Sequence, residues 1–416
     1  MAPFPFRIVE HVVPGQHIRE YPAATANSQE EPLNLAVKQY IPLDNPNPQP
    51  GDVTILAAHA NGFPKGEIHA RAKDAGFRIR SIWMTDVAWE GESSVLNEHI
   101  LGNDPSWFDH PRDLLHLVNV KRAEMPRPII GVGHSFGGAH LTQLSLMHPR
   151  LFHSLVLLDP VVQRQSTQLD GLSLEENKQI IAKTTQLSTY RRDLWPSRKA
   201  AEEGFKRSPF YQTWDPRVLD RWVKAIPPVT LRTPFHHEVF TFSRPNYNHI
   251  PGSGKPVNRV THPDLDPDNK QSYPFYRPEP VRIFSQLPFL RPSVLYIFGG
   301  KSDMCLPWMM ADKLEHTGVG IGGSGGVAAG RVRDVLLKDK GHLLAQEAVN
   351  ECADAAVAWM APELRRWKNE EESFWSEWNK KSKLEKVSVD AEWLKHVPEP
   401  ARRPKKTGAA KPESKL

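Results

Sequence analysis

Short apolar runs, separated by helix-like stretches, dominate the first 160 residues of the chain. Residues 33–42 alternate apolar and polar positions, as a strand with one buried face does. Three further runs are continuously apolar, which is typical of strands buried on both faces: 53–60, 128–133 and 154–160. Residues 109–122 instead repeat apolar positions at helical spacing. Strands that alternate with helices in this way predict an α/β fold with a mostly parallel sheet and helices on both of its faces.

The pattern of buried strands is interrupted once and then resumes. Apolar runs typical of strands return at 293–300 and 331–339. The intervening stretch, 161–291, contains helix-like segments, and its later half is rich in proline and aromatic residues. We interpret this stretch as a lid inserted into the sheet domain, because the strand pattern continues on its far side.

Four parts are therefore expected along the chain. Residues 1–160 form the first part of the α/β core, 161–291 the inserted lid, and 292–362 the second part of the core. Residues 363–416 are strongly charged with interleaved tryptophans and end in a basic tail, which predicts a helical extension at the surface. A chain of 416 residues is long enough for one such core with an insertion.

Composition excludes several classes of function. Lys and Arg exceed Asp and Glu by 53 to 48, and residues 401–416 alone account for the net charge of +5. The rest of the chain is close to neutral, so no nucleic-acid-binding face is expected. Two cysteines predict free thiols rather than a disulfide framework. The amino terminus does not resemble a signal peptide, and no apolar run approaches the ~18 residues of a transmembrane helix.

The sequence "GHSFG" (133–137) matches the pattern G-x-S-x-G between an apolar strand and a helix. In this context the pattern is typical of a nucleophile elbow, a tight turn that presents a serine hydroxyl at the end of the strand. The small residues Gly133 and Gly137 allow the strand and the helix to approach closely. Ser135 is therefore the candidate nucleophile; the competing interpretation is a glycine-rich turn with an idle serine.

A serine nucleophile needs a base, and the base needs a carboxylate that orients it. His342 follows the last predicted strand, where the base is expected in this order of elements. Two aspartates compete for the role of the acid. Asp303 follows the strand after the lid, where most enzymes of this architecture have the acid, and Asp159 ends the strand that follows the nucleophile helix. The residues alone favour neither aspartate.

The oxyanion of such a reaction needs two backbone N–H donors. One is the amide of Phe136, directly after the nucleophile. The other is expected from residues 59–62, which follow an early apolar strand, with Asn61 as the candidate. The glycine-rich run 318–323 matches a dinucleotide-binding pattern, but no strand leads into it. No metal ion and no other cofactor is predicted.

The last three residues are Ser414, Lys415 and Leu416. This tripeptide at a free carboxyl terminus is the address that peroxisomal import receptors bind. A basic tail leads up to it, which would leave the tripeptide accessible. We therefore expect a protein of the peroxisomal matrix, with an import receptor among its partners.

Several segments together resemble the fungal peroxisomal α/β-hydrolases of secondary metabolism, a group that includes the acyl-CoA hydrolase of mycophenolic acid biosynthesis and the hydrolases of AK-toxin biosynthesis. The segments are "EHVVPGQHIREYP", "MPRPIIGVGHSFGG", "LLDP", "YRPEP", "IGGSGGV" and "GHL". The resemblance implies the α/β-hydrolase fold, Ser135 as nucleophile and His342 as base. It also implies Asp159 as the acid, because the family's acid lies in the matching "LLDP".

The same resemblance implies a substrate class. An acyl-CoA thioester or a related ester of a toxin or polyketide-type pathway would be hydrolysed without a cofactor. Two rivals stay open: a peroxisomal lipase or carboxylesterase that acts on uncharged esters, and an inactive homologue that retains a small-molecule pocket. Each of them is compatible with a homo-oligomer.

Overall fold

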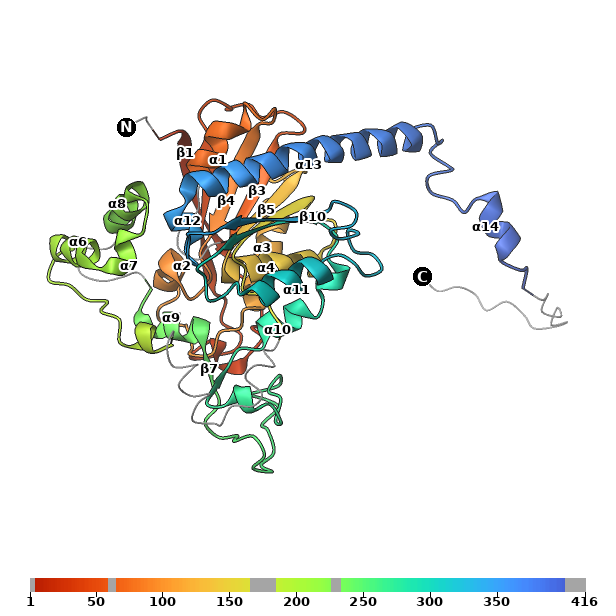
Figure 1. The fold of residues 1–416 in the computed structure, drawn as a ribbon. Coiled ribbons are helices and arrows are strands. Elements are labelled where there is room, and N and C mark those ends of the chain that lie inside the picture. The colour runs from red at the N-terminus through yellow and green to blue at the C-terminus, as the bar shows by residue number, and fades with distance from the viewer. Residues whose placement is uncertain (1–3, 59–64, 165–184, 226–232, 401–416) are drawn as a thin grey trace, which may run out of the picture. The chain divides into compact units, whose positions relative to one another are not determined.

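Eight strands form a mixed sheet at the centre of the computed structural model, which describes residues 4–58, 65–164, 185–225 and 233–400 (Figure 1). Their order across the sheet is β1-β2-β4-β3-β5-β6-β9-β10. Their bounds are β1 Phe6–Pro14, β2 Asn34–Pro42, β3 Val53–Ala58, β4 Ile79–Thr85, β5 Ile129–His134, β6 Ser154–Leu158, β9 Ser293–Gly299 and β10 Val332–Leu337. β2 pairs antiparallel with β1 and β4, and the other pairs are parallel. The predicted α/β architecture with a mostly parallel sheet is confirmed.

Apolar side chains of the central strands belong to two buried cores, one on each face of the sheet. On β6, Leu155 and Leu157 belong to one core and Val156 and Leu158 to the other, because successive side chains of a strand point to opposite faces. This two-sided burial explains why residues 155–158 are continuously apolar.

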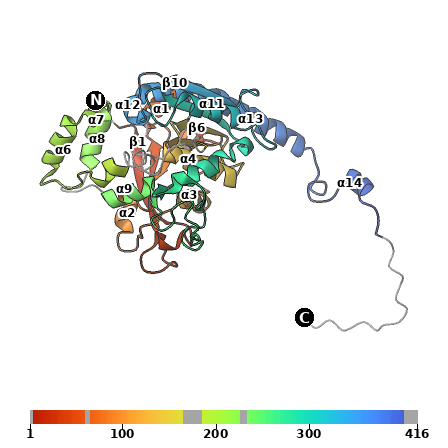
Figure 2. The ribbon, with the colours of Figure 1, turned by 60° about the horizontal axis from the view of Figure 1, so that its bottom comes forward.

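Helices cover both cores. The helices α3 (Asp109–Val120) and α4 (Phe136–Met147), which lie side by side in both views, cover the first core (Figures 1 and 2). The second core is covered by α1 (Lys65–Ala72) and α13 (Val349–Trp378). The remaining helices outside the lid are α2 Gly91–Leu96, α11 Pro307–His316, α12 Leu344–Glu347 and α14 Ala391–His396, and a 3-10 turn lies at Pro22–Ala24. Among the described residues, no helix is both long and apolar enough to cross a membrane.

The chain between β6 and β9 forms helices and a two-stranded sheet. The elements are α6 Arg198–Arg207, α7 Pro209–Gln212, α8 Pro216–Ala225, α9 Phe235–Phe242, β7 Arg244–Pro245, β8 Phe275–Tyr276 and α10 Glu279–Phe284, with 3-10 turns at Lys270–Ser272 and Leu287–Phe289. At the start of α8 the Asp215 carboxylate accepts the N–H of Arg217 at 2.9 Å, so it caps the helix that Pro216 opens. Trp195, Phe205 and Val223 form a small core of this region.

The last part of the segment expected to be the lid packs into the main core. Ile283 in α10, and Leu287 and Leu290 just after it, are buried in the same apolar cluster as Leu141 of α4. The proline-rich stretch before β9 therefore fastens the inserted region to the core.

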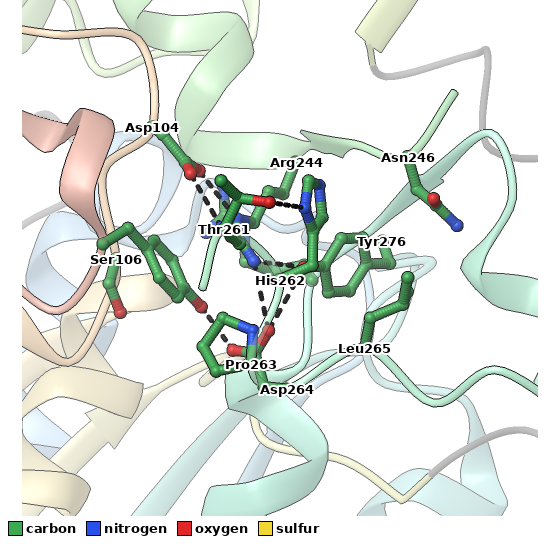
Figure 3. A network of polar contacts seen from close by, with 12 residues as sticks. Asp104, Ser106, Arg244, Asn246, Thr261, His262, Pro263, Asp264, Leu265 and Tyr276 are labelled. Carbon is green, nitrogen blue, oxygen red and sulfur yellow. Dashed lines mark hydrogen bonds and ion pairs between the residues drawn. The ribbon is translucent and has the colours of Figure 1, made fainter. Parts of the chain in front are cut away.

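A buried arginine makes a second attachment. Arg244, of which 1% is exposed, donates to both carboxylate oxygens of Asp104, at 2.6 and 2.7 Å, and to Asp264 at 3.1 Å (Figure 3). Its guanidinium also lies 3.5 Å from the ring centroid of Tyr21, and the Tyr21 hydroxyl donates to Asp264 at 2.5 Å. Asp104 and Tyr21 belong to the first part of the core, so this network ties residues 244–276 to it.

One helix covers the end of the core and the start of the extension. The chain divides into a main unit, Met1–Arg365, and a second unit that begins at Arg366, and α13 runs through this boundary. Beyond the boundary, Phe374 stacks on Trp378 with 5.8 Å between ring centroids. The surface helix expected for the extension is therefore the continuation of the helix that closes the core.

Candidate functional site

Ser135 lies in a tight turn between β5 and α4. Its backbone has φ 57° and ψ −124°, a conformation that costs free energy for any residue with a side chain. The amide of Ser135 donates to the carbonyl of Leu158 at 2.9 Å, and the carbonyl of Ser135 accepts the amides of Gly138 and Val161 at 3.0 and 3.1 Å. These bonds from the neighbouring segments hold the turn in its strained form.

Glycines allow the close contact between β5 and α4. A Cβ at Gly133 would lie 2.7 Å from the carbonyl oxygen of Gly137, and one at Gly138 would lie 2.7 Å from Cβ of Pro160. Both distances are too short for a side chain, so the turn requires glycine at each position. Sequence reasoning identified Gly133 and Gly137, and the contact at Gly138 was missed.

The structure brings Ser135, His342 and Asp159 together. The Oγ of Ser135 lies 2.8 Å from Nε2 of His342, and Nδ1 of His342 lies 2.6 Å from Oδ2 of Asp159. Ser135 follows β5, Asp159 follows β6, and the loop with His342 follows β10. Because β5, β6, β9 and β10 are neighbours in the sheet and run parallel, their carboxyl ends lie at one edge.

Asp159 is fully buried and surrounded by hydrogen-bond donors. The hydroxyl of Ser302 donates to Oδ2 at 2.5 Å, and the amide of Gly299 donates to Oδ1 at 3.4 Å. Burial alone would raise the pKa of Asp159, but hydrogen bonds from His342, Cys305 and Ser302 outweigh burial and hold this pKa below its ordinary value. The carboxylate is therefore anionic at neutral pH and is a suitable partner for an imidazolium.

Asp303, the alternative acid, points elsewhere. It lies in the loop after β9, and its side chain is exposed, whereas the side chains before and after it in the same loop, Ser302 and Cys305, are buried. Nδ1 of His342 has Asp159 as its carboxylate partner. The geometry therefore favours Asp159 over Asp303.

The backbone of the histidine loop is also fixed. The ring of His134 hydrogen-bonds through Nε2 to the carbonyl of His342 at 2.8 Å. The amide of Gly341 donates to a carboxylate oxygen of Glu347 at 3.1 Å. Sequence reasoning did not find His134, Ser302 or Glu347, although His134 occupies the variable position before the serine in "GHSFG".

Phe136 is the first residue of α4, so its amide has no acceptor within the helix and is free to bind an anion. The Phe136 ring is buried and packs against Trp107, with 5.7 Å between ring centroids. Asn61, the other predicted donor, lies outside the described residues, and so do Ser414, Lys415 and Leu416.

The helix α9 is docked beside this turn. The indole N–H of Trp107 donates to the carbonyl of Thr241 at 2.9 Å, and the indole N–H of Trp89 donates to the Thr241 hydroxyl at 2.9 Å. The same hydroxyl donates to Glu90 at 2.7 Å. Trp107 thus contacts both α9 and Phe136, so it connects the inserted region with the nucleophile turn.

One group of side chains on α11 could hold a metal ion. Ligand atoms of Asp312, Glu315 and His316 lie within 4.8 Å of one another. Asp312 pairs with Arg164, and Nδ1 of His316 contacts the carbonyl of Asp312 at 2.8 Å. Such groups are common at protein surfaces, and we assign no metal site to this one.

Comparisons with known proteins identify the family and agree with the fold. Residues 70–358 match the model of the family described as "Alpha/beta hydrolase family". The chain is 38% identical over 444 aligned positions to a type I acyl-CoA thioesterase of Penicillium brevicompactum, covering 98% of this chain and 99% of the relative. It is 29% identical to an abhydrolase domain-containing protein of Alternaria alternata, covering 57% of this chain and 84% of that protein.

Among solved structures, the fold is similar to that of the peroxisomal α/β-hydrolase Lpx1 of Saccharomyces cerevisiae. The TM-score is 0.63 at 16% sequence identity, with 91% of this chain and 99% of the other covered. At this identity the likeness concerns the fold alone.

Proposed function

The chain is a hydrolase that belongs to the α/β-hydrolase family, and we propose that it cleaves acyl-CoA thioesters with Ser135 as its nucleophile. The observation that supports this mechanism most directly is the series of hydrogen bonds from Ser135 through His342 to Asp159, at 2.8 and 2.6 Å. A serine hydroxyl becomes nucleophilic only when a base removes its proton, and this geometry supplies the base and its partner.

In the proposed reaction Nε2 of His342 takes the proton from Ser135 as Oγ attacks the thioester carbonyl. Asp159 stabilises the imidazolium that forms. The imidazolium then donates its proton to the departing CoA thiol, and an acyl-enzyme remains. His342 next takes a proton from the water molecule that attacks the acyl-enzyme. It then donates this proton to Oγ of Ser135 as the acyl–oxygen bond breaks, which releases the free acid and restores the Ser135 hydroxyl.

Two backbone amides would hold the oxyanion of each tetrahedral intermediate. The amide of Phe136 at the start of α4 is one of them, and its exposed partial positive charge at a helix terminus suits an anion. We propose the amide of Asn61 as the other. A missing donor of this kind typically costs ~3 kcal/mol of transition-state stabilisation.

The relatives support a CoA thioester over an uncharged ester as substrate. A protein that is 38% identical over almost the full chain is named an acyl-CoA thioesterase. We propose that the inserted region selects the acyl group, and that α9 takes part, because Trp107 contacts both Thr241 of α9 and Phe136 of the nucleophile turn. The pathway we propose is a toxin or polyketide-type pathway of secondary metabolism.

We propose the peroxisomal matrix as the location, because Ser414, Lys415 and Leu416 form the carboxyl-terminal address that the import receptor binds. A fluorescent protein fused to the amino terminus should enter peroxisomes, and removal of the last three residues should leave it in the cytosol. Cytosolic fluorescence of the intact fusion would contradict the assignment.

The substrate class is tested with the purified full chain. Release of free thiol from a series of acyl-CoAs is compared with release of fatty acid from triglycerides and of alcohol from simple esters. We expect thiol release to dominate, and Ser135→Ala to reduce it by several orders of magnitude. A preference for triglycerides would identify a lipase. A wild-type protein that neither turns over substrate nor reacts with a fluorophosphonate at Ser135 would identify an inactive homologue.

A further inference from the structure

The loop that follows β9 donates hydrogen bonds to Asp159, the proposed acid, which follows β6. Within this loop Ser302 and Cys305 are buried, at 5% and 3% exposure, whereas Asp303 between them is exposed. β6 and β9 are paired directly, with Leu158 opposite Ile297. The loop after β9 therefore starts next to Asp159, and the residues that it turns inward are donors to that carboxylate.

The direction of the hydrogen bond from Ser302 is fixed. Its Oγ accepts the amide of Met304 at 3.1 Å and lies 2.5 Å from Oδ2 of Asp159. An ionised carboxylate only accepts, so the hydroxyl proton must point at Asp159. The same oxygen, Oδ2, accepts from Nδ1 of His342 at 2.6 Å. One carboxylate oxygen is thus shared between the hydroxyl and the imidazole.

We propose that Ser302 is a positioning residue of the hydrolase, which acts through Asp159 on the basicity of His342. The inference rests on the proposed function of Ser135, His342 and Asp159. A donor on the shared oxygen holds the plane of the carboxylate toward the imidazole. It also withdraws negative charge from that oxygen, so the imidazolium is stabilised less than it would be by an unshared carboxylate.

Other titratable groups lie close to Asp159 and His342. Burial raises the pKa of the Cys305 thiol, which therefore stays protonated and donates to Asp159. Lys313 on α11 is fully buried, and this burial lowers the pKa of its ammonium group. The ring of His134 on β5 lies 5.3 Å from that of His342. Ser302→Ala alters none of these three side chains.

The test is Ser302→Ala, with rates expressed per active site after titration with a fluorophosphonate. We expect kcat for acyl-CoA hydrolysis to fall about tenfold with little change in KM, because the plane of the Asp159 carboxylate is no longer held toward His342 and the base is positioned less well. Without Ser302 the unshared carboxylate stabilises the charged imidazolium more, and the base must be neutral to act. The acidic limb of the kcat/KM profile should therefore move to higher pH.

Two variants sharpen this result. Ser302→Thr keeps the hydroxyl and should recover the wild-type limb and most of kcat. Ser285→Ala removes an exposed serine hydroxyl that caps the end of α10, and it should change neither quantity. An unmoved acidic limb in Ser302→Ala, or kcat within a factor of about two of the wild type, would overturn the proposal.

A double mutant shows whether Ser302 acts through Asp159. In the Asp159→Asn background, Ser302→Ala should cost little further activity, because the charge it acts on is gone. An equal loss in both backgrounds would also overturn the proposal. Should Ser302→Ala fold poorly, Ser302→Cys can replace it. The thiol is a weaker donor than the hydroxyl, so the acidic limb of the kcat/KM profile should lie at a pH between the limb of the wild type and that expected for Ser302→Ala. Failure of the proposed function would look different, since Ser135→Ala would then retain thioesterase activity.

Discussion

Ser135 and Asp159 have an unusual backbone conformation in common. Their φ angles are +57° and +44°, in a region that residues with side chains rarely adopt and that costs about 1–3 kcal/mol per residue. The neighbouring strands compensate for this cost. The amide of Asp159 donates to the carbonyl of Ile297 at 2.8 Å, as the amide of Ser135 does to Leu158 at 2.9 Å. Both side chains are thus directed at His342 by backbone turns that the sheet itself holds.

The choice of the acid can be tested at these two aspartates. Asp159→Asn should lower kcat by about four orders of magnitude, because the amide holds His342 in the wrong tautomer and does not stabilise the imidazolium. Asp303→Asn should retain most of the activity, since Asp303 is exposed and Asp159 already occupies Nδ1 of His342. Thiol release from acyl-CoA, normalised to fluorophosphonate-labelled protein, measures both. A severe loss in Asp303→Asn with an active Asp159→Asn would reverse the assignment.

Sequence predicted Ser135 and His342 by motif and by position; the residues alone could not choose between Asp159 and Asp303, and only the family resemblance implied Asp159. The reason is geometric. β6 and β9 are adjacent and parallel, so the loops after both strands start at the same edge of the sheet. Which carboxylate turns inward depends on the backbone conformation at one or two loop residues. The pattern of apolar and polar residues along the sequence does not predict this conformation. Ser302 was missed for the same reason, since a loop serine has no pattern that predicts its partner.

At the scale of elements, the buried strands were the easiest part to predict, and the edge strand β1 was the hardest. The two-sided burial of β3, β5, β6 and β9 makes their sequences continuously apolar. β1 has no such pattern. Its Ile8 and Val12 are exposed while Val13 is buried, so its apolar residues do not mark one face.

The attachment of α9 predicts a variant with altered substrate choice. Thr241→Val keeps the shape of the side chain but removes the hydroxyl that accepts from Trp89 and donates to Glu90. We expect a loss of about 1–3 kcal/mol in the free energy of unfolding, because this joint is buried. The shift of α9 should also change kcat/KM for long acyl-CoAs more than for acetyl-CoA.

Thermal unfolding measures the loss of stability. Values of kcat/KM for acyl-CoAs of increasing chain length measure the change in substrate choice. Val260→Thr, the reverse exchange at an exposed valine of the same inserted region, is the matched control and should change neither stability nor selectivity. Equal losses for short and long acyl groups in Thr241→Val would mean that α9 does not contribute to the acyl site.

For the whole molecule, the inserted region is held to the core at several described places, among them Thr241, Arg244 and the core residues in and after α10. Sequence predicted the insertion from the gap between strands, but composition could not show where it is anchored. Proline and aromatic residues before β9 resemble a lid wall in composition, yet Ile283 and Leu287 pack against the sheet domain.

Arg244 provides the test at this scale. Arg244→Lys keeps the charge but loses the two parallel bonds to Asp104, which a single ammonium does not reproduce. Removing one partner of a buried pair typically costs about 3–5 kcal/mol, so Arg244→Met should destabilise strongly and Arg244→Lys less. Hydrogen exchange of the backbone amides at 244–276 should accelerate in both variants. Unchanged exchange there would show that other contacts hold this segment.

The position of Asp159 before the inserted region has an evolutionary consequence. The proposed nucleophile, its helix amide and the proposed acid all lie within residues 129–161, one strand–helix–strand unit. Insertions or deletions between β6 and β9 therefore leave the spacing of Ser135 and Asp159 unchanged. In a chain with its acid after β9, the same events would fall between nucleophile and acid. A chain of this order can thus diversify the segment proposed to select the acyl group, while Ser135 and Asp159 are inherited together as one block.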